Sequence, residues 1–141
     1  MRKLSIIILC LYQISSAQYV VQSPYLDTPA LAIGYVDSCA KFWTKAYEPT
    51  YGGFYTNIDR KGNLIASWGT NKNTLNQSRD AYGFTRAFML TGNEEYLVYA
   101  RHALGFMYKN AWDKTYGGWF NDINNDGTPS KPTANKTAYY Q

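Results

Sequence analysis

Cysteine and histidine are scarce in this chain of 141 residues, which contains two cysteines and one histidine. Cys10 lies in the apolar start of the chain, so Cys39 alone remains in the part expected to fold. A single cysteine forms no intramolecular disulfide, and stability must therefore come from packing. His102 falls mid-way along an expected helix, a position typical of a packing residue. We predict no bound metal and no cofactor.

Long apolar runs are also missing. The stretch Leu4–Tyr12 is apolar but far shorter than the ~20 residues that span a bilayer. Two basic residues precede it, and Ser15-Ser16-Ala17 places small residues before a cut at Gln18. This pattern predicts a secretory signal peptide at residues 1–17, followed by a domain at 18–141 in a secreted or periplasmic protein.

The chain carries only a small excess of positive charge. Without Arg2 and Lys3 the formal net charge falls from +4 to +2, because residues 1–17 contain no acidic residue. The remaining basic residues are scattered, which does not indicate nucleic acid binding. No other stretch is long and apolar enough for a membrane span, so we expect no membrane association after the signal is removed.

An internal repeat organises the rest of the chain. Tyr47–Tyr55 (YEPTYGGFY) matches Trp112–Phe120 (WDKTYGGWF) at an offset of 65 residues. Lys72–Gln77 (KNTLNQ) matches Lys136–Gln141 (KTAYYQ) at an offset of 64. Two matches at nearly one spacing predict a repeated supersecondary unit.

Each unit is predicted to consist of a helix, a small hairpin and a second helix. The expected elements are a helix from Pro29, a hairpin with strands Phe54–Ile58 and Leu64–Trp68, helices at about Asn73–Leu90 and Glu94–Asn110, a hairpin within Tyr116–Gly127, and a helix starting near Lys136. The larger apolar side chains of the helices, such as Tyr35, Tyr82, Met89 and Leu104, are expected to face the core. Such units stack on neighbours, and the chain stops as the fourth helix begins, so we expect a fragment.

Several features together carry a family resemblance: the two Tyr-Gly-Gly-aromatic hairpins, Lys72-x-x-Leu75-x-Gln77-x-Arg79, Lys136-x-x-Tyr139-x-Gln141, and the link Thr91–Leu97. Over roughly Leu31–Gln141 the chain resembles the N-acylglucosamine 2-epimerase family, which includes cellobiose 2-epimerases and aldose–ketose isomerases. The resemblance implies an all-α fold, the (α/α)6 barrel. Here it would comprise the first one and a half to two helical hairpins, with small β-hairpins in the loops.

The resemblance also implies a function. It makes Arg79 a catalytic residue that contacts the sugar oxygens, and it gives Tyr139 a substrate-binding role. The reaction would be proton transfer at C2 of an open-chain sugar through an enediolate, with a small sugar or oligosaccharide as partner. The family's acid/base histidines lie in later hairpins, so the present chain should be inactive by itself.

Other functions remain open at this stage. Arg79 could form a surface ion pair with Asp80 or Glu48 instead of entering a cavity. Export also fits a glycoside hydrolase or polysaccharide lyase on a helical barrel, or a carbohydrate-binding protein without activity. A hydrolase needs two facing carboxylates, and Asp80 is the only candidate near an inner-helix start.

Two further patterns in the sequence bear on ligand binding. Asp122-x-Asn124-x-Asp126-Gly127 resembles the first half of a calcium loop, but Thr133 stands where the loop needs a bidentate glutamate. Aromatic residues near the expected inner-helix starts, among them Tyr55, Trp68 and Trp119, could stack on a sugar or pack in the core.

Overall fold

The computed structural model describes residues 23–140, and the predicted signal peptide lies outside them. The chain divides into two compact units, residues 1–31 and 32–141. The described part of the first unit contains the short helix α2 (Pro24–Asp27), which Ser23 caps by accepting from the Tyr25 N–H, and the start of α3.

The remaining elements are mostly helical, as predicted. In order they are α3 (Pro29–Trp43), η1 (Thr44–Ala46), η2 (Ala66–Trp68), β1 (Lys72–Asn73), α4 (Thr74–Thr91), α5 (Glu95–Phe106), η3 (Met107–Ala111), β2 (Asp122–Ile123) and η4 (Ala138–Tyr140). No helix within residues 23–140 has the length and apolar character needed to cross a membrane.

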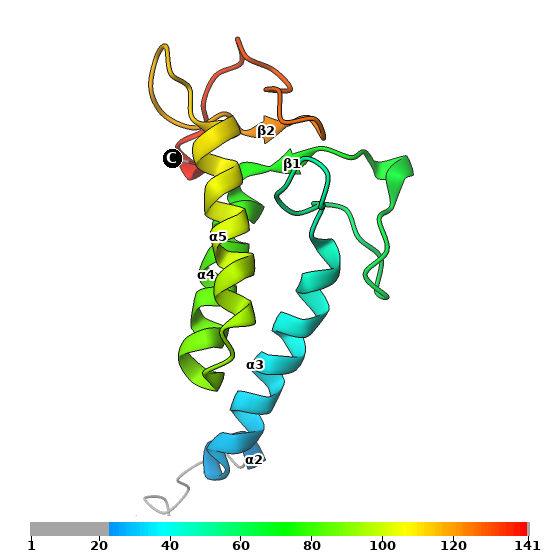
Figure 1. The fold of residues 1–141 in the computed structure, drawn as a ribbon, viewed down its shortest axis with the longest axis vertical. Coiled ribbons are helices and arrows are strands. Elements are labelled where there is room, and N and C mark those ends of the chain that lie inside the picture. Colours follow the sequence, from blue (N-terminus) through cyan, green and yellow to red (C-terminus); the bar gives the residue numbers. More distant parts are fainter. Residues whose placement is uncertain (1–22, 141) are drawn as a thin grey trace, which may run out of the picture. The chain divides into compact units, whose positions relative to one another are not determined.

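Helices α4 and α5 form an antiparallel pair joined by a tight link (Figure 1). Gly92 ends α4 in the left-handed conformation at φ 73°, and its N–H donates to the Phe88 carbonyl at 2.7 Å. Asn93 Oδ1 then accepts from the Glu95 N–H at the start of α5. These are the roles that the sequence predicts for a glycine and an asparagine at such a link.

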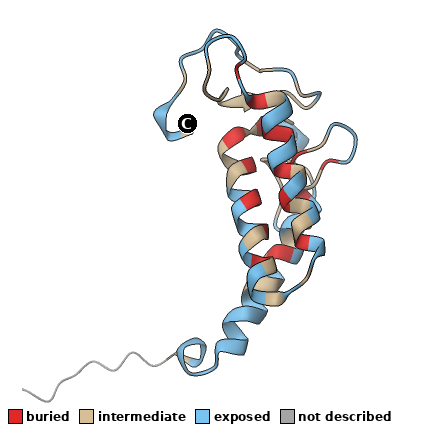
Figure 2. Ribbon diagram, turned by 60° about the vertical axis from the view of Figure 1, so that its left-hand side comes forward, coloured by how far each residue is buried: buried red, intermediate tan, exposed pale blue. Residues whose placement is uncertain are grey.

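The core lies between these helices and is built largely from small residues. Buried positions of α4 and α5 face each other along the pair (Figure 2). They include Ala81, Phe84 and Ala87 of α4, and Tyr96, Ala100 and Ala103 of α5; Ala40, Ala46 and Phe54 complete the cluster.

The predicted core faces of the helices are partly wrong. Tyr35, Tyr82, Met89 and Leu104 were expected in the core, but all four are exposed. Alanines occupy the contact face instead, because small side chains let two helices approach closely. Tyr35, Tyr82, Met89 and Leu104 therefore lie on the other sides of their helices, while Phe84 and Tyr96 are the large residues of the contact face.

The Tyr-Gly-Gly hairpins fold in the same way in both repeats. Tyr47 pairs with Phe54 in the first, and Trp112 pairs with Trp119 in the second. The N–H of the next residue then donates to the carbonyl of a fully buried alanine. Tyr55 donates to Ala46 and Phe120 donates to Ala111, both at 2.8 Å. The offset of 65 residues is thus a structural repeat.

The strands expected within the first hairpin are not formed. Only isolated bridges occur there, such as Ile58 with Leu64, and residues 66–68 form the 3-10 turn η2. Asn57 explains this difference, because its side-chain amide donates to the carbonyls of Trp68 and Gly69 at 3.0 and 3.1 Å. A side chain therefore takes carbonyls that a longer strand ladder would use.

The two named strands join the repeats to each other. β1 and β2 pair antiparallel, with Lys72 opposite Ile123 and Asn73 opposite Asp122 (Figure 1). Thr74 strengthens the contact, since its hydroxyl donates to the Phe120 carbonyl at 2.6 Å. The second hairpin thereby stacks on the start of α4. The helix expected from Lys136 is represented in the described residues only by the short turn η4.

Candidate functional site

The start of α4 is held by a buried lysine. Lys72 is fully buried, and its ammonium donates to Glu48 Oε2 at 2.9 Å, to the Gly52 carbonyl at 2.7 Å and to the Asn125 carbonyl at 3.0 Å. It also lies 4.9 Å from the centre of the Phe106 ring. One charged group therefore connects the first hairpin, the second hairpin and the strand before α4.

Glu48 organises the first Gly-Gly turn around this lysine. Its carboxylate accepts the N–H groups of Thr50 and Tyr51 at 2.7 and 2.8 Å. Burial opposes its ionisation, but the bonds from Lys72 and from these N–H groups outweigh that effect and hold the pKa of Glu48 below its ordinary value. Burial lowers the pKa of Lys72, and Glu48 opposes part of that shift.

The second repeat builds the same arrangement at its own hairpin. Asp113 accepts the N–H groups of Thr115 and Tyr116, and Lys136 donates to Asp113 Oδ2 and to the Gly117 carbonyl, both at 2.6 Å. The Lys136 bond and the Tyr116 N–H lower the pKa of Asp113. The lysine of each Lys-x-x-x-x-Gln motif thus fixes the turn that precedes it in its own unit.

Gln77 ties the first hairpin to α4. Its side-chain Oε1 accepts the Phe54 N–H at 2.9 Å, and its Nε2 donates to the Phe54 carbonyl at 2.8 Å. The amide therefore pairs with the backbone as a neighbouring strand would. The sequence motif contains Lys72 and Gln77, but it does not predict that both side chains bind the first hairpin.

Arg79 and Tyr139, the two predicted site residues, lie in contact. Arg79 Nη2 donates to Tyr139 Oη at 2.5 Å, and the guanidinium carbon lies 5.7 Å from the centre of the Tyr139 ring. Arg79 stands in the second turn of α4, Tyr139 in η4, and both side chains are exposed. Residues from two repeats, 60 positions apart, are therefore brought together beside the hairpin loops.

Among the described residues, Arg79 forms neither of the ion pairs considered for it, with Asp80 or with Glu48. Glu48 is bound to Lys72, so the surface pair between Glu48 and Arg79 is not formed.

His102 lies against Tyr47, with its Nδ1 3.3 Å from the tyrosine hydroxyl and the rings 4.5 Å apart, which is a packing arrangement. The two aspartates of the calcium-like pattern accept hydrogen bonds from the chain itself. Asp122 accepts from the Asn73 amide, and Asp126 accepts from the Thr128 N–H.

A cavity of about 470 Å³ opens between α3 and α4 on the same side as Arg79. It combines aromatic rings with polar groups, the mixture from which sugar-sized sites are commonly built. Its lining includes Tyr35, Trp43, Tyr55, Asn76, Arg79 and Asp80. Tyr139 does not line the cavity, but it is bound to Arg79, which does.

Asp80 is the carboxylic acid of this cavity. Burial raises the pKa of Asp80 to about 7. Arg79 and Arg86 line the same cavity, and desolvation is the cause of the shift in the pKa of Asp80. A carboxyl that is half-protonated near neutral pH is capable of both accepting and donating a proton.

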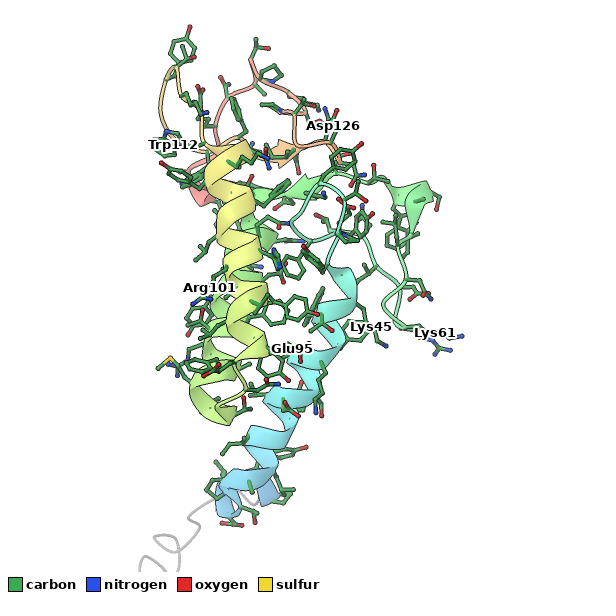
Figure 3. All side chains as sticks on the ribbon, in the orientation of Figure 1. Lys45, Lys61, Glu95, Arg101, Trp112 and Asp126 are labelled. Atoms are coloured by element: carbon green, nitrogen blue, oxygen red, sulfur yellow. The ribbon has the colours of Figure 1, made fainter. Side chains whose placement is uncertain are left out.

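The predicted stacking residues have different surroundings. Tyr55 lines the cavity, and Trp119 packs edge-on against Trp112 with ring centres 4.9 Å apart. Trp68 is 73% exposed on η2. The hairpin that carries Trp68 is bound to η1, where Lys45 Nζ donates to the Lys61 carbonyl at 3.1 Å (Figure 3).

The two matching hairpins, each followed by a lysine that fixes its turn, place the chain in the class of proteins built from repeated helix–hairpin–helix units. The family model for N-acylglucosamine 2-epimerase (GlcNAc 2-epimerase) matches residues 53–141. The chain belongs to this family. The resemblance drawn from the two hairpins and the Lys-x-x-x-x-Gln motifs is thereby confirmed.

Individual relatives agree with this assignment. A cellobiose 2-epimerase from Ruminococcus albus is 29% identical over 100 residues, which are 67% of this chain and 24% of the relative. The solved cellobiose 2-epimerase from Spirochaeta thermophila DSM 6192 is 25% identical with a TM-score of 0.61, over 77% of this chain and 27% of that one. A solved D-mannose isomerase shares the fold, with 19% identity and a TM-score of 0.59, over 70% of this chain and 25% of that one.

These relatives also define how much of the barrel is present. The structural neighbours are (α/α)6-barrel proteins, and the matched region is part of such a barrel. The chain spans about a quarter of the length of the relatives it matches.

Proposed function

We propose that the complete gene product is a sugar 2-epimerase or aldose–ketose isomerase that moves a proton at C2 of an open-chain sugar. Membership of the family supports this class of reaction. The observation that carries the site is the contact between Arg79 and Tyr139, because it gathers two hydrogen-bonding groups from different repeats beside one cavity.

Arg79 is suited to hold the sugar oxygen that becomes negative. Removal of the C2 proton next to a carbonyl gives an enediolate, whose oxygen charge a fixed guanidinium stabilises. The guanidinium carries several N–H donors, and the bond to Tyr139 occupies one nitrogen. The remaining donors are available to a sugar carbonyl and a neighbouring hydroxyl.

Tyr139 would orient the sugar. Its oxygen accepts from Arg79, which leaves the phenolic hydrogen to donate to a substrate oxygen. A charged donor polarises the hydroxyl and makes it a better donor in turn. The two side chains therefore act as one unit, with Arg79 at the reacting oxygen and Tyr139 on an adjacent hydroxyl.

Proton transfer at C2 needs groups whose pKa is near neutral, and we expect histidines from later hairpins to take this role. Within this chain, Asp80 is the cavity group whose pKa, about 7, falls in that range. The same acid is the observation that favours a glycoside hydrolase as second candidate, since a hydrolase needs a protonated carboxyl. It also needs a facing carboxylate, and among the described residues Asp80 is the only carboxylate that lines the cavity.

Incubation with free aldoses and with glycans distinguishes these functions. The complete gene product, supplied with cellobiose, mannose or glucose in deuterated water, should incorporate deuterium at C2 and release the C2 epimer or the ketose. Release of a shorter glycan without incorporation would support the hydrolase. Sugar binding without either product would identify a carbohydrate-binding protein.

A further inference from the structure

A single asparagine connects the elements that carry Arg79 and Tyr139. Asn73 ends β1 and caps α4, with its Oδ1 accepting from the Asn76 N–H at 3.3 Å. Its Nδ2 donates to Asp122 Oδ1 at 2.9 Å and to Tyr140 Oη at 3.0 Å. The amide therefore reaches α4, β2 and η4 at once.

This connection joins the elements on which the two site residues lie. Arg79 projects from the helix that Asn73 caps, and Tyr139 precedes the tyrosine that Asn73 binds. The turn η4 makes further contacts with α4. Tyr140 is half-buried, while Tyr139 beside it is 63% exposed. Asn73 therefore holds the half-buried ring of Tyr140, and the exposed ring of Tyr139 lies against Arg79.

We propose that Asn73 is a positioning residue for the Arg79–Tyr139 pair. It acts through Tyr140 and Asp122 and does not touch the sugar. The proposal deepens the proposed function and rests on it for any effect on turnover, while the effect on the Arg79–Tyr139 contact is independent of activity.

Helix capping alone does not account for Asn73. Serine, threonine and aspartate cap helices as well, since capping needs only a side-chain oxygen. The two Nδ2 contacts require an amide. At the equivalent place in the second repeat the chain has Thr137, which accepts from Asn121 through its hydroxyl. The amide bridge thus belongs to the repeat that carries Arg79 and is not a general feature of the unit.

The test separates the cap from the bridge. Asn73→Ser keeps a capping oxygen and loses both Nδ2 donors, and Tyr140→Phe removes the acceptor of one bond while keeping the ring. Asn93→Ser is the matched control, because Asn93 also accepts at a helix start and lies away from the pair. Side-chain arginine NMR of the complete gene product reports the pair directly, with the bound Arg79 signal assigned by its loss in Tyr139→Phe.

We expect the bound Arg79 signal to be lost or strongly broadened in Asn73→Ser and Tyr140→Phe, and kept in Asn93→Ser. The rate of C2 exchange should fall about ten- to a hundredfold in kcat in the first two variants, as small misplacements of a reacting group do. In a Tyr139→Phe background the same substitutions should cost little more.

An unchanged Arg79 signal in both Asn73→Ser and Tyr140→Phe overturns the proposal. Equal losses of kcat with and without the Tyr139 hydroxyl also overturn it, since a merely structural role gives additive effects. If the wild type exchanges no sugar, the proposed function fails, and the NMR comparison still decides whether Asn73 positions the pair.

Discussion

Glu48 and Lys72 form an ion pair, 2.9 Å long, in which both side chains are almost completely buried. Its counterpart in the second repeat, Asp113 with Lys136, is 2.6 Å long, but the lysine side chain there is 24% exposed. The same chemistry is thus present twice with different burial. This difference provides a matched test of what the pair contributes.

Lys72→Met should destabilise the chain by about 3–5 kcal/mol, because it leaves the Glu48 carboxylate buried without its counter-charge. Lys136→Met should cost about 2 kcal/mol, since water reaches the second pair and replaces part of the lost hydrogen bonding. Guanidinium unfolding followed by circular dichroism measures both. Equal losses in the two variants would show that burial does not determine the contribution.

Gly53→Ala should be more damaging than Gly117→Ala. Both glycines have positive φ, 77° and 71°, so alanine carries the same backbone strain at each site, about 1–2 kcal/mol. A Cβ on Gly53 would lie 2.7 Å from Phe106 Cγ and 2.9 Å from Gln77 Oε1, whereas on Gly117 the nearest atom is 4.0 Å away. The clash should add about 1–3 kcal/mol at Gly53. Unfolding free energies that agree within error for the two variants would contradict the packing described here.

Asp80 should make the stability of the folded chain depend on pH. Because burial raises its pKa to about 7, the folded state retains a proton that the unfolded chain releases near pH 4. The contribution of Asp80 to the free energy of unfolding is fully present below pH 4 and is lost as the pH rises from 4 to 7. Asp80→Asn stays neutral, so above pH 7 it should be more stable than wild type by up to about 4 kcal/mol, at about 1.4 kcal/mol per unit of pKa. A stability difference that is the same at pH 5 and pH 8 would exclude this behaviour.

Residues 1–17 are proposed to be removed on export, given the basic start, the short apolar run and the small residues before Gln18. Amino-terminal sequencing of the protein recovered from outside the cytoplasm should therefore begin at Gln18 or next to it. Arg2 and Lys3 should be absent. Their presence in the exported form would contradict the proposal.

The sequence predicted the helices, the repeat and the family well, because these depend on local signals. Asn73, Gly92 and Asn93 act at helix ends, and such capping residues are readable from the sequence. The helix faces were less predictable. Helix α4 carries large residues such as Tyr82 on one side and Ala81 and Ala87 on another, and periodicity does not say which side meets a neighbour.

The two candidate site residues, Arg79 and Tyr139, were predicted from the sequence and are in contact, whereas the residues that support them were not predicted. The family resemblance implies the roles of Arg79 and Tyr139, and their contact follows from the way the second hairpin stacks on α4. The bonds of Lys72 to Asn125 and of Asn73 to Tyr140 join positions 53 and 67 residues apart. Contacts of that separation depend on tertiary packing, which a single sequence does not specify.

The most direct test of the account is C2 hydrogen exchange by the complete gene product and its Arg79 variants in deuterated water. Wild type should exchange the C2 hydrogen of at least one free aldose. Arg79→Ala should lose on the order of 100-fold or more in turnover, the usual effect of removing a donor to a developing oxyanion. Arg79→Lys should not restore it, because a point charge replaces the planar fork. Exchange by Arg79→Ala at the wild-type rate would show that Arg79 is a surface residue and that the site lies elsewhere.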